Sequence, residues 1–158
     1  MKYFMQTIRF SPNFSVLGFE KTTEGYYKNT VDDSLWIERS LLDLGWGQEK
    51  GLCRVPLLFF EQLLDLVFTP FDIRAKKITD EQYNFWGALS ILLEDYPLKF
   101  LDIVEAKFRK NEISFQKNKY LLDLIDKELF CEEKDIPKIK EDIRLKYQKW
   151  YEIKKILN

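Results

Sequence analysis

The chain has 158 residues, of which 46% are hydrophobic, 16% aromatic and 32% charged, a composition typical of a folded globular protein. Its 25 basic and 26 acidic side chains give a formal net charge of -1, so no overall charge attracts nucleic acid or an anionic membrane. The absence of histidine excludes a Ser-His-Asp triad, a Cys-His dyad and histidine-ligated zinc. From this length we expect a single domain over residues 1–158.

Short strands are expected in residues 1–30. Phe4, Ile8 and Phe10 follow a period-2 pattern. Farther along the chain, Gly18 and Gly25 lie between two apolar runs, one that ends at Leu17 and one that begins at Tyr26. We therefore predict two or three short strands, forming a β-hairpin region at the N-terminus.

From about residue 31 onward the pattern favours helices. Asp32 and Asp33 suit the first turn of a helix that ends near Gly45, and Thr79 with Gln82 fits a capping box. Pro97 suits the first turn of a further helix. The expected helices cover residues 32–44, 57–68, 80–93, 97–108, 117–130 and 135–157. The predicted fold is mainly α, a helical bundle or HEAT-like stack of about five to six helices after the N-terminal β-hairpin region.

The HEAT-like alternative depends on a proline spacing. Pro56, Pro97 and Pro137 are almost evenly spaced along the chain, and each lies five positions before an acidic residue. A period of about 40 residues is typical of helical-repeat proteins, which bind partners on a concave face. Three prolines that simply begin three helices would produce the same spacing.

The cysteines and the apolar segments favour a cytoplasmic protein. Cys53 and Cys131 lie far apart in the sequence without a CxxC motif, which indicates two buried reduced thiols, with a long-range disulfide as the alternative. The N-terminus lacks the apolar core of a signal peptide, and the apolar run over residues 55–68 is interrupted by acidic residues. We expect no membrane partner.

No motif indicates an enzyme or a cofactor. The glycine cluster at residues 45–51 lacks the spacing of a phosphate-binding loop. Neighbouring carboxylates such as Asp32 and Asp33 do not converge as an acid/base pair does. The basic C-terminal helix is expected to pack its apolar stripe on the core and keep its lysines in solvent. We therefore expect no catalytic residue, no metal, no cofactor and no nucleic-acid partner.

An acidic, aromatic segment is the strongest candidate for a protein-binding site. Residues 20–65 contain nine acidic and five basic side chains, a net charge of -4. Aromatic side chains and acidic rims are favoured at interfaces with basic partners. The predicted partner-binding residues are Asp32, Asp33, Trp36, Glu38, Asp43, Trp46 and Glu49, with the two tryptophans as anchors.

This profile resembles that of bacterial immunity proteins, the inhibitors encoded beside polymorphic or contact-dependent growth inhibition toxins. The resemblance lies in the small size, the mild acidity, the many aromatic residues and the acidic segment, over the whole chain. It implies a non-enzymatic protein that neutralises a cognate toxin, such as a nuclease, by covering it.

Two alternatives from other classes are open at this point. A helical-repeat adaptor or regulatory subunit would bind its partner around Glu61, Asp102 and Asp142. A hydrolase or transferase would depend on dispersed carboxylates alone.

Overall fold

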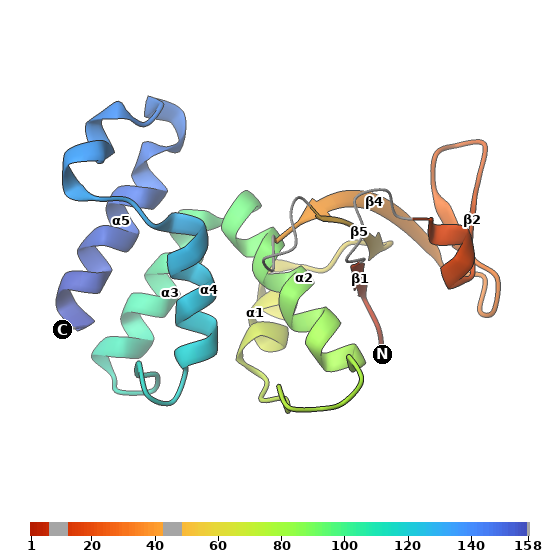
Figure 1. Cartoon of the computed structure of the whole chain (residues 1–158), viewed down its shortest axis with the longest axis horizontal. Helices are drawn as coiled ribbons and strands as arrows, with labels where there is room; N and C mark the ends of the chain where they lie inside the picture. The colour runs from red at the N-terminus through yellow and green to blue at the C-terminus, as the bar shows by residue number, and fades with distance from the viewer. Residues whose placement is uncertain (7–12, 43–48, 158) are drawn as a thin grey trace. The chain divides into compact units, whose positions relative to one another are not determined.

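The computed structural model describes residues 1–6, 13–42 and 49–157 (Figure 1). Its internal contacts divide the chain into two compact units, Met1–Leu92 and Leu93–Asn158. We call these the first and the second unit and describe each by itself. The boundary falls within helix α2 (Asp80–Asp95).

The first unit is built on a five-stranded antiparallel sheet (Figure 1). Its order is β1-β5-β4-β3-β2, so the strand nearest the N-terminus lies beside the last one. The strands are β1 (Phe4–Gln6), β2 (Phe19–Lys21), β3 (Tyr27–Asn29), β4 (Leu35–Leu41) and β5 (Glu49–Arg54). The short strands expected in the N-terminal segment are thus confirmed, and a 3-10 helix, η1 (Phe14–Leu17), separates the first two.

The expectation of a mainly α fold is wrong, because residues 35–41 and 49–54 form β4 and β5 where a helix and its connector were expected. The chain is an α/β protein with an antiparallel sheet, and the predicted bundle or HEAT-like stack is not present. Asp33, expected in a first helical turn, has a φ of 62° and belongs to a turn. A residue in this left-handed conformation does not continue a right-handed helix.

The two faces of the sheet have different covers. Directly paired residues of an antiparallel sheet share a face, so Trp36 lies with Arg54 on one face while Phe4 lies with Cys53 on the other. The Trp36 face is covered by η1, whose Phe14 packs edge-on against Tyr27 at a centroid distance of 5.1 Å. Phe19 packs in the same way against Trp36 at 5.5 Å.

Helix α2 contacts the opposite face. The Leu42 amide donates to Ser90 Oγ of this helix at 2.8 Å. Gly87 of α2 lies so close to Phe4 that a methyl group there would overlap the phenyl ring. A glycine is needed at this position because no side chain fits between the helix and β1.

Local sequence signals predicted helix α1 and the start of helix α2. Helix α1 (Phe60–Phe68) buries Phe60, Leu63 and Val67 on one side, as its spacing requires. At the start of α2, the Thr79 amide donates to Gln82 Oε1 at 2.9 Å. The Gln82 amide donates back to Thr79 Oγ1 at 3.2 Å, which confirms the predicted capping box.

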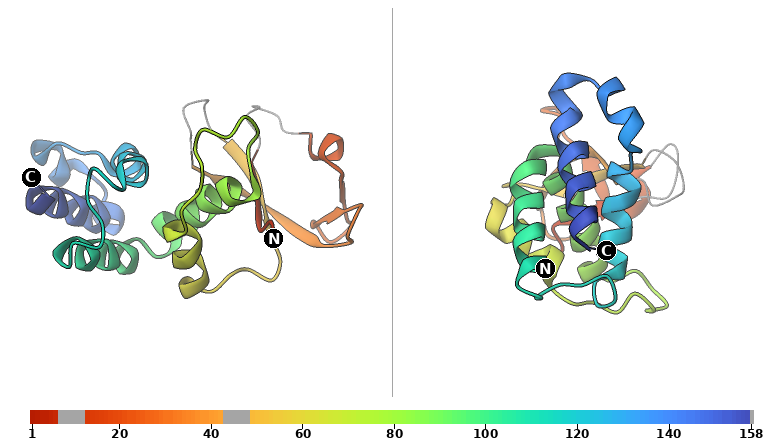
Figure 2. Two further views of the ribbon diagram at one scale, coloured as in Figure 1. Left: turned by 90° about the horizontal axis from the view of Figure 1, so that it is seen from below. Right: turned by 90° about the vertical axis from the view of Figure 1, so that its left-hand side faces the viewer.

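The second unit is helical (Figure 2). It contains α3 (Pro97–Arg109), α4 (Lys119–Leu129), the 3-10 helix η2 (Glu133–Lys138) and α5 (Glu141–Leu157). Helix α5 packs against both α3 and α4, and its Trp150 is fully buried. The indole Nε1 of Trp150 donates to Asp126 of α4 at 3.0 Å, so the buried N–H is satisfied.

The three evenly spaced prolines have three different roles. Pro97 opens α3, as predicted, whereas Pro56 lies in the connection between β5 and α1. Pro137 lies inside η2, so the last α-helix begins at Glu141 and not near Asp135. The spacing therefore does not mark a structural repeat.

Both cysteines are free thiols; Cys53 is buried and Cys131 is partly exposed. Across the described residues, every helix is either too short or too polar for a transmembrane span.

Candidate functional site

The turn between β3 and β4 is held by a network of hydrogen bonds. We call residues 29–34 the acidic turn. The Asn29 amide donates to the Ser34 carbonyl at 2.8 Å, and the Asp33 amide donates to the Asn29 carbonyl at 3.0 Å. The side chain of Asn29 also accepts from the Val31 amide at 2.8 Å. These bonds close the turn at its base and hold its tip in one conformation.

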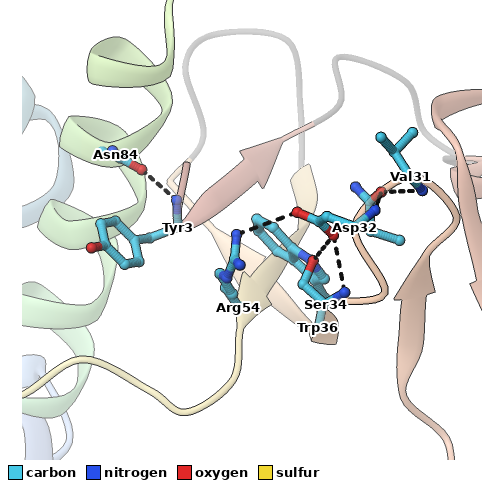
Figure 3. A network of polar contacts seen from close by, with 8 residues as sticks. Tyr3, Val31, Asp32, Ser34, Trp36, Arg54 and Asn84 are labelled. Atoms are coloured by element: carbon cyan, nitrogen blue, oxygen red, sulfur yellow. Dashed lines mark hydrogen bonds and ion pairs between the residues drawn. The ribbon is translucent and has the colours of Figure 1, made fainter. Parts of the chain in front are cut away.

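A polar network joins the acidic turn to the core (Figure 3). Buried Trp36 donates from Nε1 to Ser34 Oγ at 2.8 Å, and that hydroxyl donates to Asp32 Oδ1 at 2.5 Å. The Ser34 amide donates to the same carboxylate oxygen at 2.9 Å. The side chain of Asp32 is thereby fixed from two directions.

The charge of Asp32 is stabilised by its neighbours. The hydrogen bonds from Ser34 lower the pKa of the Asp32 carboxyl, and Arg54 adds a smaller effect in the same direction. Arg54 Nη1 lies 3.7 Å from Asp32 Oδ2, and its guanidinium lies 5.8 Å from the centre of the Trp36 ring. Asp32 therefore stays ionised well into the acidic range.

A second connection holds the turn to η1. The backbone amide of Thr30 donates to the Gly18 carbonyl at 2.9 Å, and the Thr30 hydroxyl donates to the same oxygen at 3.0 Å. Gly18 has a φ of 88°, a conformation that favours glycine, and it ends η1. Val16, in η1, is also largely exposed.

The acidic turn exposes one apolar side chain next to its two acidic residues. Val31 at its tip is 91% exposed, while the neighbouring Asp32 and Asp33 side chains are 48% and 79% exposed. Asp33 lies 3.3 Å from Lys28 Nζ. Single exposed apolar residues are common on proteins, but this one stands on a rigid turn and is followed directly by two acidic residues.

The structure brings part of the predicted site together. Asp32 and Asp33 lie in the acidic turn, and Glu38 lies on β4, where Tyr27 Oη donates to it at 3.3 Å and Lys50 Nζ lies at 3.4 Å. That contact contributes to the raised pKa of Tyr27, for which partial burial is the larger cause. Asp43 and Trp46 lie outside the described residues, as does the side chain of Glu49.

Trp36 is a core residue. Its side chain is only 2% exposed and packs against Phe14, Phe19 and Leu52. It therefore cannot serve as the exposed anchor that the sequence suggested, because its ring is already covered by the protein itself. Its indole N–H supports the acidic turn from inside.

Val31, Ser34 and Arg54 were missed by sequence reasoning. The run Asn29-Thr30-Val31-Asp32-Asp33-Ser34 is rich in turn-forming residues and has one apolar member, a signal that could have revealed the turn. Nothing local points to Arg54, which lies well beyond Asp32 in the sequence and reaches it through the pairing of β4 with β5.

Within residues 1–6, 13–42 and 49–157, no group of three cysteine, aspartate or glutamate side chains is placed to hold a metal ion. Comparison with protein-family models, curated proteins and solved structures produced no match.

Proposed function

We propose that the protein is a non-enzymatic inhibitor of the immunity type, which neutralises a cognate bacterial toxin in the cytoplasm by covering a basic surface of it. The observation that carries this proposal is Val31, an apolar side chain held in solvent on a rigid turn that also carries Asp32 and Asp33. In this proposal Val31 replaces Trp36 as the anchor.

Rigidity supports a binding role for the acidic turn. A loop that is already ordered loses little conformational entropy when a partner binds, so more of the contact energy appears as affinity. Asn29 and Ser34 supply that order within the turn, and Trp36 and Arg54 extend it to the sheet.

Charge supports a basic partner. Exposed carboxylates at an interface raise the association rate with a positive surface and disfavour acidic competitors. Among the described residues, Asp32, Asp33 and Glu38 supply this rim. Each also lies in an ion pair, with Arg54, Lys28 and Lys50 respectively, which a positive surface would have to displace. Asp43, Trp46 and Glu49 stay predicted members of the same site.

The proposal is preferred to the helical-repeat adaptor for a specific reason. The adaptor depended on a structural repeat, and the three prolines that suggested it occupy structurally different positions. The adaptor would also use Glu61, Asp102 and Asp142, which are spread over both units.

Growth protection tests the proposal. The chain should restore growth to cells that express the toxin encoded beside its gene, and Val31→Asp should abolish the protection. Leu145→Asp introduces the same charge at a 62% exposed apolar position of the second unit and should leave protection intact. Equal protection by both variants, or no protection by the unaltered chain, would refute the proposal.

Kinetics separate the two parts of the site. Val31→Asp should raise the dissociation rate of the complex about 30-fold, as expected for loss of a hot spot of about 2 kcal/mol. Asp33→Lys should instead lower the association rate about tenfold at low salt, with the difference shrinking as salt is added. Asp65→Lys on α1 changes the same charge elsewhere in the first unit and serves as the control.

A further inference from the structure

The second unit has a cavity lined by the C-terminal end of α3, the loop that joins it to α4, and Ile156 of α5. The cavity has a volume of about 350 Å³. Its apolar walls include Phe108 and Phe115, whose ring centroids lie 6.2 Å apart at an interplanar angle of 52°. Phe115 is 38% exposed, so part of its side chain is accessible from solvent.

Ile113 and Ile156 also line the cavity, and its remaining lining residues are polar. Asn111 and Gln116 each carry a side-chain amide with a donor and an acceptor, and Arg109 adds a guanidinium. Glu105 holds the guanidinium in place, with its Oε1 3.1 Å from Arg109 Nη2, and leaves the remaining N–H groups of Arg109 available. The cavity therefore combines aromatic surface with groups that pair with the edge of a planar heterocycle.

The loop that forms the cavity is well ordered. The Asn111 amide donates to the Phe108 carbonyl at 3.0 Å, and the Glu112 amide donates to the Lys107 carbonyl at 2.9 Å. Further along, the Asn118 amide donates to the Ser114 carbonyl at 2.9 Å. These bonds fix the cavity before any ligand is bound.

The loop carries a local positive charge that the total charge of the chain hides. Residues 107–119 contain five basic side chains and one acidic side chain. Three of the five are in ion pairs: Lys107 with Glu112, Arg109 with Glu105 and Lys119 with Asp123. Within the described part of the chain, Lys110 and Lys117 form no ion pair.

We propose that this cavity binds a nucleotide, either free or as one unit of a single-stranded nucleic acid. The base stacks on Phe115 and Phe108, its edge is met by Asn111, Gln116 and Arg109, and Lys110 and Lys117 attract the phosphates. Aromatic stacking combined with nearby cations is the usual basis of single-strand binding. The site lies in the second unit and does not depend on the proposed inhibitory function.

This proposal revises the expectation that no nucleic acid binds. That expectation followed from the net charge of -1 of the whole chain. Salt limits the reach of a charge to about 10 Å at about 0.1 M. Lys110 and Lys117, unpaired among the described residues, therefore act on a nearby phosphate more strongly than the net charge of the whole chain does.

Binding of short labelled single strands of RNA and DNA to the full chain tests the site, with fluorescence anisotropy as the readout. AMP, GMP, CMP and UMP are added as competitors. Phe115→Ala should weaken binding about tenfold, because stacking on one aromatic ring contributes that order of affinity. Lys110→Gln with Lys117→Gln should reduce the slope of log affinity against log salt by about 1.4, the value for two phosphate contacts on a single strand.

Matched controls make the result specific. Phe130→Ala removes another exposed phenylalanine of the second unit, and Lys76→Gln with Lys77→Gln removes two exposed cations elsewhere. Both should leave affinity and salt slope unchanged. Arg109→Gln provides a second cavity variant, and circular dichroism establishes that each variant is folded.

The competitors distinguish the two sources of the ligand. A strand that binds far more tightly than any mononucleotide would identify single-stranded nucleic acid, whereas equal affinity per site would identify a free nucleotide. No binding of either at millimolar concentration would overturn the proposal, as would binding that both cavity variants leave unchanged. Toxin neutralisation should be the same for Phe115→Ala and the unaltered chain, so failure here is distinct from failure of the inhibitory function.

Discussion

Replacing Gly87 by alanine would place a methyl group where the side chain of Phe4 lies. The new carbon would overlap the Cβ, Cγ and Cδ1 atoms of Phe4, which is 3% exposed and is held in β1 opposite Cys53. Because the methyl group would overlap three atoms of the Phe4 side chain, the ring must be displaced or the helix and the strand must separate.

The expected cost can be worked from these contacts. Displacing Phe4 from its site forfeits about 2–3 kcal/mol of burial, and alanine returns about 1 kcal/mol through its better helix propensity than glycine. The net destabilisation of Gly87→Ala should therefore be about 1–2 kcal/mol. Without the steric overlap, the same substitution in a helix would increase stability.

Urea unfolding followed by tryptophan fluorescence measures this, since Trp36 and Trp86 both belong to the first unit. In a Phe4→Ala background, Gly87→Ala should cost at least about 1 kcal/mol less, which is the coupling expected for residues in direct contact. The relief is partial because the Cβ of Phe4 stays in place.

Gly25→Ala is the control for this cycle. Gly25 has a φ of 90° with no atom near its missing side chain, so alanine there costs backbone strain alone, by the same amount in both backgrounds. A Gly87→Ala variant as stable as the parent, or a cost that Phe4→Ala leaves unchanged, would refute the packing of α2 on β1.

Three further predictions concern polar contacts. The Asn84 side chain accepts from the Tyr3 amide and donates to the Met1 carbonyl, each at 2.8 Å. In urea unfolding, Asn84→Leu should destabilise the first unit by about 2 kcal/mol, because both bonds are lost. Asn84→Asp keeps an acceptor for the Tyr3 amide and should cost about half as much. The pKa of Asp32 is lowered in the folded state, so the stability that this carboxylate confers is present above its unfolded-state pKa and is lost as the pH falls through the folded-state pKa. In an NMR titration, Ser34→Ala should raise the folded-state pKa of Asp32, because it removes the hydroxyl that donates to the carboxylate. An unchanged pKa would contradict the network. Trp150→Phe removes the hydrogen bond to Asp126 and should lower the free energy of unfolding of the second unit by about 1–2 kcal/mol. Lys154→Gln removes a partly exposed ion pair with the same carboxylate and should lower it by under about 1 kcal/mol.

The helical signals that the sequence carries are local, and those at the starts of α2 and α3 were read correctly. Asp32 and Asp33 do not begin a helix, and the last α-helix starts at Glu141 instead of near Asp135. The Thr79–Gln82 capping box, Pro97 at the start of α3 and the apolar spacing of α4 all depend on residues within a few positions of one another. Absence of histidine likewise excludes whole classes of catalytic site without reference to any fold.

The error at residues 31–54 has a physical cause. Along β4 the buried residues are Trp36 and Leu41, which lie on opposite faces of the sheet because they are an odd number of positions apart. One buried side chain of the strand lies on the face covered by η1 and the other lies on the face that α2 contacts. The buried residues of β4 therefore follow neither a period of 2 nor one of 3.6. Its identity as a strand depends on pairing with β3 and β5.

The candidate site shows the same division. Asp32 and Asp33 were recognisable from the sequence as exposed acidic residues, because adjacent carboxylates are rarely buried. Only tertiary structure placed Trp36 in the core, brought Arg54 to Asp32, and left Val31 in solvent on a fixed turn. Those three outcomes depend on which strands pair and on what covers each face of the sheet, and both are set by contacts between residues far apart in the chain.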